Sequence, residues 1–95
     1  MNTQTWQGLS VRTRDGYVLG VVTGTFTDGV LAGRLRVEGR EPRVDLTGGL
    51  PSDTRVYAVP CRAVRGREQD SLMLDVSLGV ARGRWLMHVV RTKGA

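Results

Sequence analysis

Hydrophobic and polar residues alternate along much of this 95-residue chain, a pattern that predicts short β-strands. Three such runs occupy residues 8–14, 17–27 and 30–38. They are separated by Asp15-Gly16 and Asp28-Gly29. The Asp-Gly dipeptide is favoured in two-residue type I′ hairpin loops, because both central residues of such a loop need positive φ. The first third of the chain should therefore form a three-stranded antiparallel meander.

The alternation also assigns the faces of these strands, because successive side chains of a strand point to opposite sides. The first strand should bury Leu9, Val11 and Thr13 and expose Ser10, Arg12 and Arg14. The second has Leu19 and Val21 opposite Val18, Val22 and Phe26, so both of its faces are apolar, as in a central strand. The third has Leu31, Leu35 and Val37 opposite Ala32, Arg34 and Arg36. The interrupting glycines are typical of strands that bend strongly, namely Gly20, Gly24 and Gly33.

The middle of the chain reads as an excursion followed by a fourth strand. Residues 39–53 contain at most one short strand, at 44–46, before paired glycines and Pro51 end it. Residues 54–59 alternate again and stop at Pro60, which lacks the amide needed to continue a ladder of hydrogen bonds. The next residues, "PCRAV", predict one short helical turn with Arg62 and Arg65 facing outward and Ala63 or Val64 packed inward.

A polar loop, "RGREQD", should then lead to a strand at 71–78, which places Leu72, Leu74, Val76 and Leu78 on one face. The last apolar run, Trp85–Val90, has apolar residues on both faces and predicts a strand buried on both sides. A short helix with Leu86, Val89 and Val90 facing inward is the alternative. Together these elements predict an all-β fold in a single domain, 1–95: a small, strongly coiled antiparallel β-barrel, because closure removes exposed strand edges.

Three segments of this pattern resemble the PRC-barrel family, a small β-barrel of ribosome-maturation factors and of the photosynthetic reaction-centre H subunit. They are "VRTRDGYVLGVV", "RVYAVPCRAV" and "SLMLDV". The matching positions are Asp15, Gly16, Gly20 and Val22, then Tyr57, Val59, Pro60 and Val64, then Leu72 to Val76. The resemblance covers residues 9–78 and leaves 79–95 outside, as a basic C-terminal strand or tail. It implies a PRC-barrel-like core with an adaptor or assembly role and no catalysis.

Charge adds a second hypothesis. The net charge of +5 comes from thirteen arginines and one lysine against nine acidic residues. Residues 79–95 carry four basic residues and no acidic one, so most of the excess lies in the tail. Basic strand faces of small barrels can follow a phosphate backbone, which makes RNA or DNA binding the alternative function. A solvated arginine surface remains equally compatible with the composition.

Residues with catalytic or metal-binding chemistry are sparse. Cys61 and His88 are the single cysteine and the single histidine. They are too few for a metal site without several carboxylates, and a lone thiol after a proline is typical of a small buried hydrophobe. We therefore expect no catalytic residues, no metal and no cofactor. The single cysteine, the absence of a signal-peptide pattern and apolar runs of about four residues are typical of a cytoplasmic protein without a membrane span.

The function predicted from the sequence is a non-enzymatic, cytoplasmic protein-binding or adaptor module that pairs with another protein or forms a homodimer. Trp85 is either a core residue or, beside arginines, the anchor of an interface. The candidate contacts for a protein or nucleic-acid partner are Arg12, Arg14, Arg34, Arg36, Arg82, Arg84, Trp85, Arg91 and Lys93.

Overall fold

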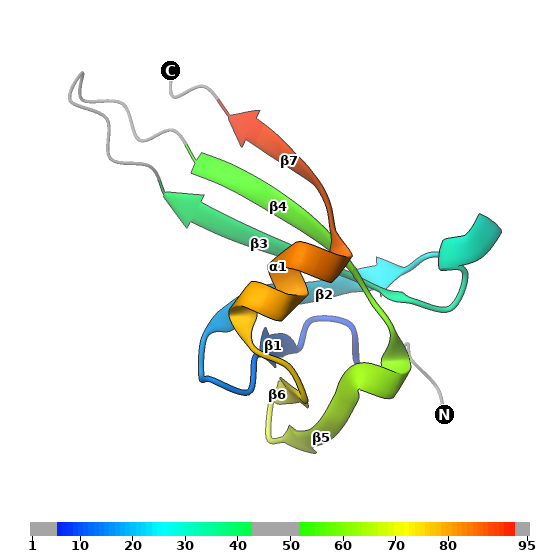
Figure 1. Ribbon diagram of the computed structural model, residues 1–95, viewed down its shortest axis with the longest axis vertical. Helices are drawn as coiled ribbons and strands as arrows, with labels where there is room; N and C mark the ends of the chain where they lie inside the picture. The colour runs from blue at the N-terminus through cyan, green and yellow to red at the C-terminus, as the bar shows by residue number, and fades with distance from the viewer. Residues whose placement is uncertain (1–5, 43–51, 93–95) are drawn as a thin grey trace.

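The computed structural model describes residues 6–42 and 52–92 of the chain, and its seven strands form one sheet in the order β5-β6-β1-β2-β3-β4-β7 (Figure 1). The strands are β1 (Ser10–Arg12), β2 (Val18–Thr25), β3 (Leu35–Pro42), β4 (Ser52–Val59), β5 (Val64–Glu68), β6 (Ser71–Leu74) and β7 (Leu86–Thr92). The helices are the 3₁₀ turns η2 (Gly29–Leu31) and η3 (Cys61–Ala63) and the α-helix α1 (Leu78–Trp85). The predominantly β class is thus confirmed.

The predicted meander is confirmed, and β4 extends it, because β1 to β4 are neighbours in chain order and pair antiparallel. The type I′ prediction for the first hairpin is wrong. The amide of Gly16 donates to the carbonyl of Thr13 (3.0 Å), and Gly16 has a φ of 90°. This is a three-residue loop with glycine in the left-handed region. The carboxylate of Asp15 accepts a hydrogen bond from the Thr13 hydroxyl, which holds the loop in this form.

The second hairpin is longer than predicted, because β3 begins at Leu35 rather than at residue 30. Gly29 and Gly33 have φ values of 66° and 85°, so the chain between them turns through η2 instead of extending. The hairpin closes where the amide of Phe26 donates to the carbonyl of Arg34 (2.9 Å). Its tip projects from the body of the molecule (Figure 1), and Val30 there is 95% exposed.

Strand β2 is central in the sheet, as predicted, but its two faces are not both buried. Leu19 and Val22 are buried, whereas Val18 and Val21 are 57% and 39% exposed. The pairing with β1 shifts between Val11 and Arg12, which leaves Leu19 as an extra residue of β2. A bulge of this kind re-aims one side chain, so the alternation read from the sequence does not continue through the strand.

Two glycines allow β2 and β3 to approach closely. A Cβ atom added to Gly20 would overlap the carbonyl of Glu38, and one added to Gly39 would overlap the carbonyl of Leu19. Each glycine therefore accommodates the backbone of the opposite strand. The predicted excursion is shorter than 39–53, because β3 continues to Pro42 and β4 begins at Ser52. The possible strand at 44–46 lies outside the described residues.

Only the last two residues of "RGREQD", Gln69 and Asp70, form a turn, because β5 extends to Glu68 and pairs with β6. Strand β6 is shorter than predicted and ends at Leu74, although Leu72 and Leu74 are buried as expected. It pairs with β1 in parallel, so the sheet is not purely antiparallel. The helical turn after Pro60 is confirmed as η3, with Arg62 and Arg65 exposed.

The C-terminal region contains a helix that the sequence analysis missed. Residues 78–85 form α1, with Ser77 as its N-cap: the Ser77 hydroxyl accepts a hydrogen bond from the amide of Val80. The strand predicted near Trp85–Val90 exists as β7, but its expected burial on both sides is wrong. Its residues from Met87 to Val90 are exposed, because the core does not extend over this part of the strand.

The described strands form an open sheet with β5 and β7 at its two edges, so closure into a barrel is not confirmed. One face of the curved sheet carries the core, and α1 packs Ala81 and Trp85 against it. The sheet contributes Val11, Leu19, Val22, Leu35, Val37, Tyr57, Val59, Leu72 and Leu74 to this core. Val56 and Ala58, on the other face of β4, are buried as well. In the described ranges, no helix has the length and apolar content needed to span a bilayer.

The start of α1 is joined to the β1–β2 turn through Asp15, whose carboxylate accepts a hydrogen bond from the amide of Leu78 (3.1 Å). The hydrogen bond from Thr13 lowers the pKa of Asp15 most, and although the loss of solvation opposes it, the hydrogen bond from the Leu78 amide helps to hold this pKa below its ordinary value of 3.8. A lowered pKa means that the charged form stabilises the folded state, so this contribution is present above about pH 4 and is lost as the pH falls further.

We therefore predict that Asp15→Asn lowers the melting temperature at neutral pH, and that the difference from the wild-type protein disappears as the pH falls below about 4. Thermal denaturation of both proteins from neutral to acidic pH measures this convergence. A difference that stays constant with pH would show that the Asp15 charge does not hold α1 in place.

Candidate binding surfaces

The arginines predicted on β3 are engaged within the sheet. A guanidinium nitrogen of Arg36 lies 3.3 Å from a carboxylate oxygen of Glu38. Arg34 is half-buried, and its guanidinium donates to the carbonyl of Ala58 on β4 (3.5 Å). Both residues therefore already have partners in the folded chain.

Arg12 and Arg14 are exposed, as predicted. Arg12 lies at the end of β1, next to Val18 of β2 in the register of the sheet. Arg14 lies in the turn that follows, where its amide donates to the carbonyl of Val76 (2.7 Å). The exposed apolar side chains of β2 stand between this pair and the arginines of β3, so the two predicted pairs belong to separate parts of the sheet.

The candidates from the tail occupy different environments. Arg82 and Arg84 lie on α1, where Arg82 is half-buried and Arg84 is exposed. The backbone of Arg91 belongs to β7, but its side chain and all of Lys93 lie outside the described part of the structure. Trp85 is 9% exposed and packs in the core, so little of its ring is accessible to a partner.

Two further arginines, Arg65 and Arg67 on β5, lie close to Arg12 and Arg14, although the sequence did not suggest them as contacts. Strands β5 and β6 form a hairpin, and β6 pairs with β1. Arg14, Arg65 and Arg67 line one hollow of about 350 Å³. Arg12 lines a second one, of about 570 Å³, and both hollows share Glu68 and Met73. We call these two adjoining hollows the arginine hollow.

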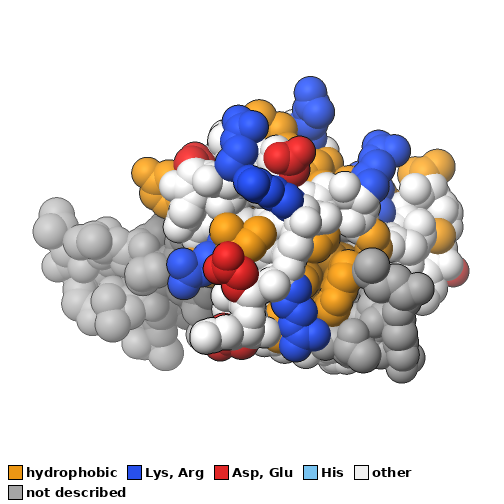
Figure 2. Space-filling model, turned by 90° about the horizontal axis from the view of Figure 1, so that it is seen from below, with side chains coloured by type: hydrophobic (Ala, Val, Ile, Leu, Met, Phe, Trp, Pro, Cys, Tyr) orange, Lys and Arg blue, Asp and Glu red, His pale blue; other side chains and the backbone are white. Residues whose placement is uncertain are grey.

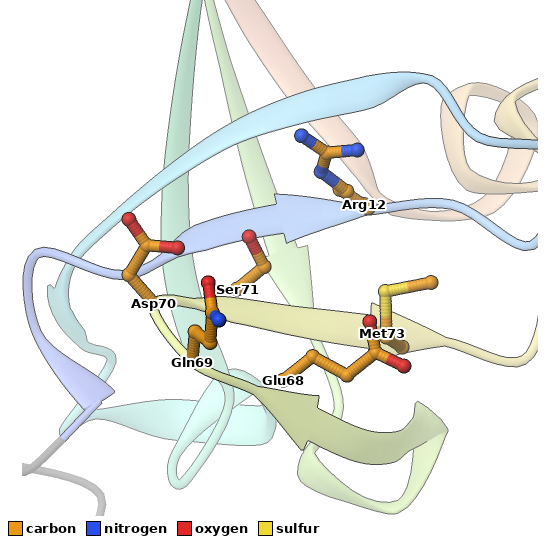
Figure 3. Close-up of a pocket in the computed structure, with 6 residues that line it drawn as sticks. All are labelled: Arg12, Glu68, Gln69, Asp70, Ser71 and Met73. Atoms are coloured by element: carbon orange, nitrogen blue, oxygen red, sulfur yellow. The ribbon is translucent and has the colours of Figure 1, made fainter.

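The side chains around the second hollow come from β1, from β5, from β6 and from the turn between β5 and β6, as Figure 3 shows. Seen from the side of β5 and β6, the surface carries basic side chains with a few acidic ones between them (Figure 2). The sequence signal that could have identified Arg65 and Arg67 is the pattern Arg-Gly-Arg, in which the glycine leaves open space between two long cations.

The second candidate surface is the outer edge of β7, which pairs with no described strand other than β4. Three apolar side chains are exposed along this strand, Met87 (44%), Val89 (40%) and Val90 (48%). No charged residue occurs from Leu86 to Val90. Monomeric proteins usually protect such edges with charges, prolines or bulges. Leu86 to Val90 contain a bulge at Met87 but no charge and no proline, so this edge is suited to pairing with another strand.

The residues considered for catalysis show no arrangement of an active site. The thiol of Cys61 is half-buried and donates to the carbonyl of Gly33 (3.2 Å). His88 is exposed on β7 and pairs with Val56 in the middle of β4, whereas Cys61 follows the end of that strand. Within residues 6–42 and 52–92, no three His, Cys, Asp or Glu side chains gather in a way that could hold a metal ion.

Comparison with protein-family models, with curated proteins and with solved structures gives no match to this chain. The class that its own residues define is a curved, open and mostly antiparallel β-sheet with one helix packed on the core face. Its accessible features are an uncharged strand edge at β7 and an arginine hollow at the opposite end of the strand order.

Proposed function

We propose that this protein is a non-enzymatic, cytoplasmic protein-binding module, and that its β7 edge pairs with the same edge of a second copy to form a homodimer. The observation that carries the proposal is the exposure of Met87, Val89 and Val90 along an uncharged strand edge. Burial of these side chains between two copies would remove apolar surface from water, and pairing would satisfy the backbone groups of the edge.

The opposite edge of the sheet, β5, differs from β7 because it carries charged side chains. Strand β5 carries Arg65, Arg67 and Glu68, and its pairing with β6 is interrupted by a bulge between Val64 and Gly66. Charges and bulges are the devices that protect an edge from pairing. The pairing of β7 with β4 also shifts, between Val56 and Tyr57, so charge is what distinguishes the two edges: β5 carries three charged residues, whereas β7 has none from Leu86 to Val90.

A second copy is the partner that best fits β7, because an antiparallel strand pair with a two-fold axis brings one strand against itself. Val89 is the central residue of Leu86–Thr92. An axis at this position places Val89 opposite Val89 and His88 opposite Val90. No charged side chain then faces a like charge, since Arg91 lies opposite Met87. The pairing is therefore self-complementary.

The resemblance to the PRC-barrel family supports the same class of function, since it implies an adaptor or assembly role without catalysis. The segments that carry it lie in β1, in β2 and in the region from β4 to β6, so they belong to the body of the sheet and not to the β7 edge. In this proposal the PRC-barrel-like part is the scaffold, and the C-terminal strand provides the contact.

Self-association is tested with charges placed at the centre of β7. We expect the wild-type protein to sediment with twice the mass of the 10.4 kDa chain. Val89→Lys and Val89→Glu should each sediment as a monomer, because like charges directly opposite each other destabilise a strand pair. An equimolar mixture of the two variants should recover the dimer, since opposite charges then face each other.

The matched control is Val30→Lys, which adds the same charge at a more exposed valine on the β2–β3 hairpin. It should leave the dimer intact, and circular dichroism should show the same folded state for all variants. A wild-type protein that stays monomeric at every concentration contradicts the proposal. So does a Val30→Lys protein that dissociates as readily as Val89→Lys.

A further inference from the structure

The arginine hollow holds cations that form no salt bridge in the described part of the chain. Among those residues, no ion pair involves Arg12, Arg14, Arg65 or Arg67. In contrast, Arg36 has Glu38 and Arg34 has the carbonyl of Ala58. Two carboxylates, Glu68 and Asp70, line the second hollow beside Arg12. The four guanidinium groups outnumber these two carboxylates and Asp15, the chain neighbour of Arg14, which leaves positive charge available to a ligand.

Local structure positions these arginines. The amide of Arg14 is hydrogen-bonded to Val76, next to the buried end of β6, so its place in the turn is fixed. The Nε of Arg67 donates to the carbonyl of Gln69 (3.2 Å), which holds the guanidinium stem and leaves its terminal nitrogens available. Arg65 lies at the bulge between Val64 and Gly66, and bulges are a common way to redirect a side chain.

The chemistry of the hollow is that of a phosphate site with polar groups next to it. Guanidinium groups present paired N–H donors that match phosphate oxygens. Beside them, the β5–β6 turn supplies the amide of Gln69 and the carboxylate of Asp70, and the first residue of β6 supplies the hydroxyl of Ser71 (Figure 3). Such groups can hydrogen-bond to the edges of bases, and Met73 provides apolar surface shared by both hollows.

We propose that the arginine hollow binds single-stranded nucleic acid, with Arg12, Arg14, Arg65 and Arg67 on successive phosphates and the β5–β6 turn beside the bases. A single strand is favoured because its base edges are free to reach the polar turn. This function is separate from dimer formation, because β5 and β7 are the opposite ends of the strand order. The two proposals can therefore fail independently.

The test is fluorescence anisotropy with a labelled RNA and a labelled DNA, each about ten nucleotides long, titrated at about 50 and 200 mM salt. For single strands the salt slope is about 0.7 per phosphate contact, so four contacts predict roughly 50-fold weaker binding at the higher salt. The double variant Arg65→Ala/Arg67→Ala should bind more weakly at low salt. The affinity of this double variant should fall only about 7-fold between the two salt concentrations, because two phosphate contacts remain.

The matched control is Arg62→Ala/Arg84→Ala, which removes the same charge from two exposed arginines outside the hollow. It should retain the wild-type salt dependence, and thermal melts should confirm that both double variants are folded. The proposal is overturned if the wild-type protein does not bind, or if the control loses as much affinity and salt slope as the hollow variant. Equal competition by inorganic polyphosphate, or equal binding of a duplex, also overturns it, because the site would then recognise charge alone.

Discussion

Trp85→Ala is expected to lose a large part of the stability of this protein. The indole is 9% exposed and packs with the core residues of the sheet. Truncation of a buried tryptophan costs about 3–5 kcal/mol, because the lost apolar contacts leave a cavity. A domain of this size has roughly 5–15 kcal/mol in total, so the melting temperature should fall by at least about 12 °C.

The position of Trp85 at the end of α1 increases the effect. Ala81 and Trp85 are the two residues of this helix that are buried, and they lie on the same side of it because they are four positions apart. Alanine at 85 leaves the helix with only Ala81 and the partly buried Leu78 against the core, so α1 should loosen from the sheet. Urea denaturation followed by circular dichroism measures both the loss of stability and the loss of helix signal.

Two further variants separate a core role from an interface role for this tryptophan. Trp85→Phe retains most of the apolar volume and should lose much less stability than Trp85→Ala. Arg84→Ala, at the exposed neighbouring residue, should change the free energy of unfolding by less than about 0.5 kcal/mol. If Trp85→Ala melts like the wild-type protein but sediments as a monomer, the ring belongs to an interface and the core assignment is wrong.

Gly20→Ala is expected to cost about 3 kcal/mol, near the upper end for overpacked sites. The added methyl group would meet the carbonyl of Glu38, and a backbone group cannot move aside as the end of a long side chain can. Strands β2 and β3 would have to separate at this point, which weakens their pairing. Chemical denaturation compares the free energy of unfolding with that of the wild-type protein.

Gly24→Ala is the matched control, because it lies in the same strand and a methyl group there would meet no atom within 4 Å. We expect a change of less than about 0.5 kcal/mol. Gly39→Ala should resemble Gly20→Ala, and the double variant should cost less than the sum of the two, since one separation of the strands accommodates both methyl groups. Equal effects of Gly20→Ala and Gly24→Ala would contradict the close approach of the strands.

The burial of strand residues and the position of turns could be predicted from the sequence where they depend on neighbouring residues alone. Leu72 and Leu74, Leu35 and Val37, and the helical turn after Pro60 follow from alternation and from the properties of proline. Prediction failed where the pairing partner decides the geometry. The bulge at Leu19 depends on the register with β1, and the exposure of β7 depends on how far the core extends over it.

The helix α1 was missed for a different reason. Gly79 and Gly83 lower its intrinsic helix propensity. Its stability comes instead from Ser77 at the N-cap, from Asp15 on a distant turn and from the burial of Ala81 and Trp85. Two of these three contributions are tertiary, so a pattern search along the chain finds only Ser77.

For the candidate sites, too, local patterns identified some residues, whereas contacts between distant strands were needed to identify others. Arg12 and Arg14 could be selected from the sequence because they alternate with the buried residues Val11 and Thr13 along the chain. Arg65 and Arg67 are more than 50 positions away and join them only because β6 pairs in parallel with β1 and brings β5 along. Arg36 was selected as well, but Glu38, two residues away on the same strand face, pairs with it.

The β class of this protein, the meander of its first half, the turn after Pro60 and its basic charge are properties of the amino-acid sequence, because each depends on residues close together in the chain. Strand order, the parallel pairing of β6 with β1, the open edge at β7 and the grouping of arginines around one hollow depend on contacts between distant residues. Such contacts form where burial of apolar surface in the whole sheet is most favourable. A local sequence pattern does not determine which distant segments will bury that surface together.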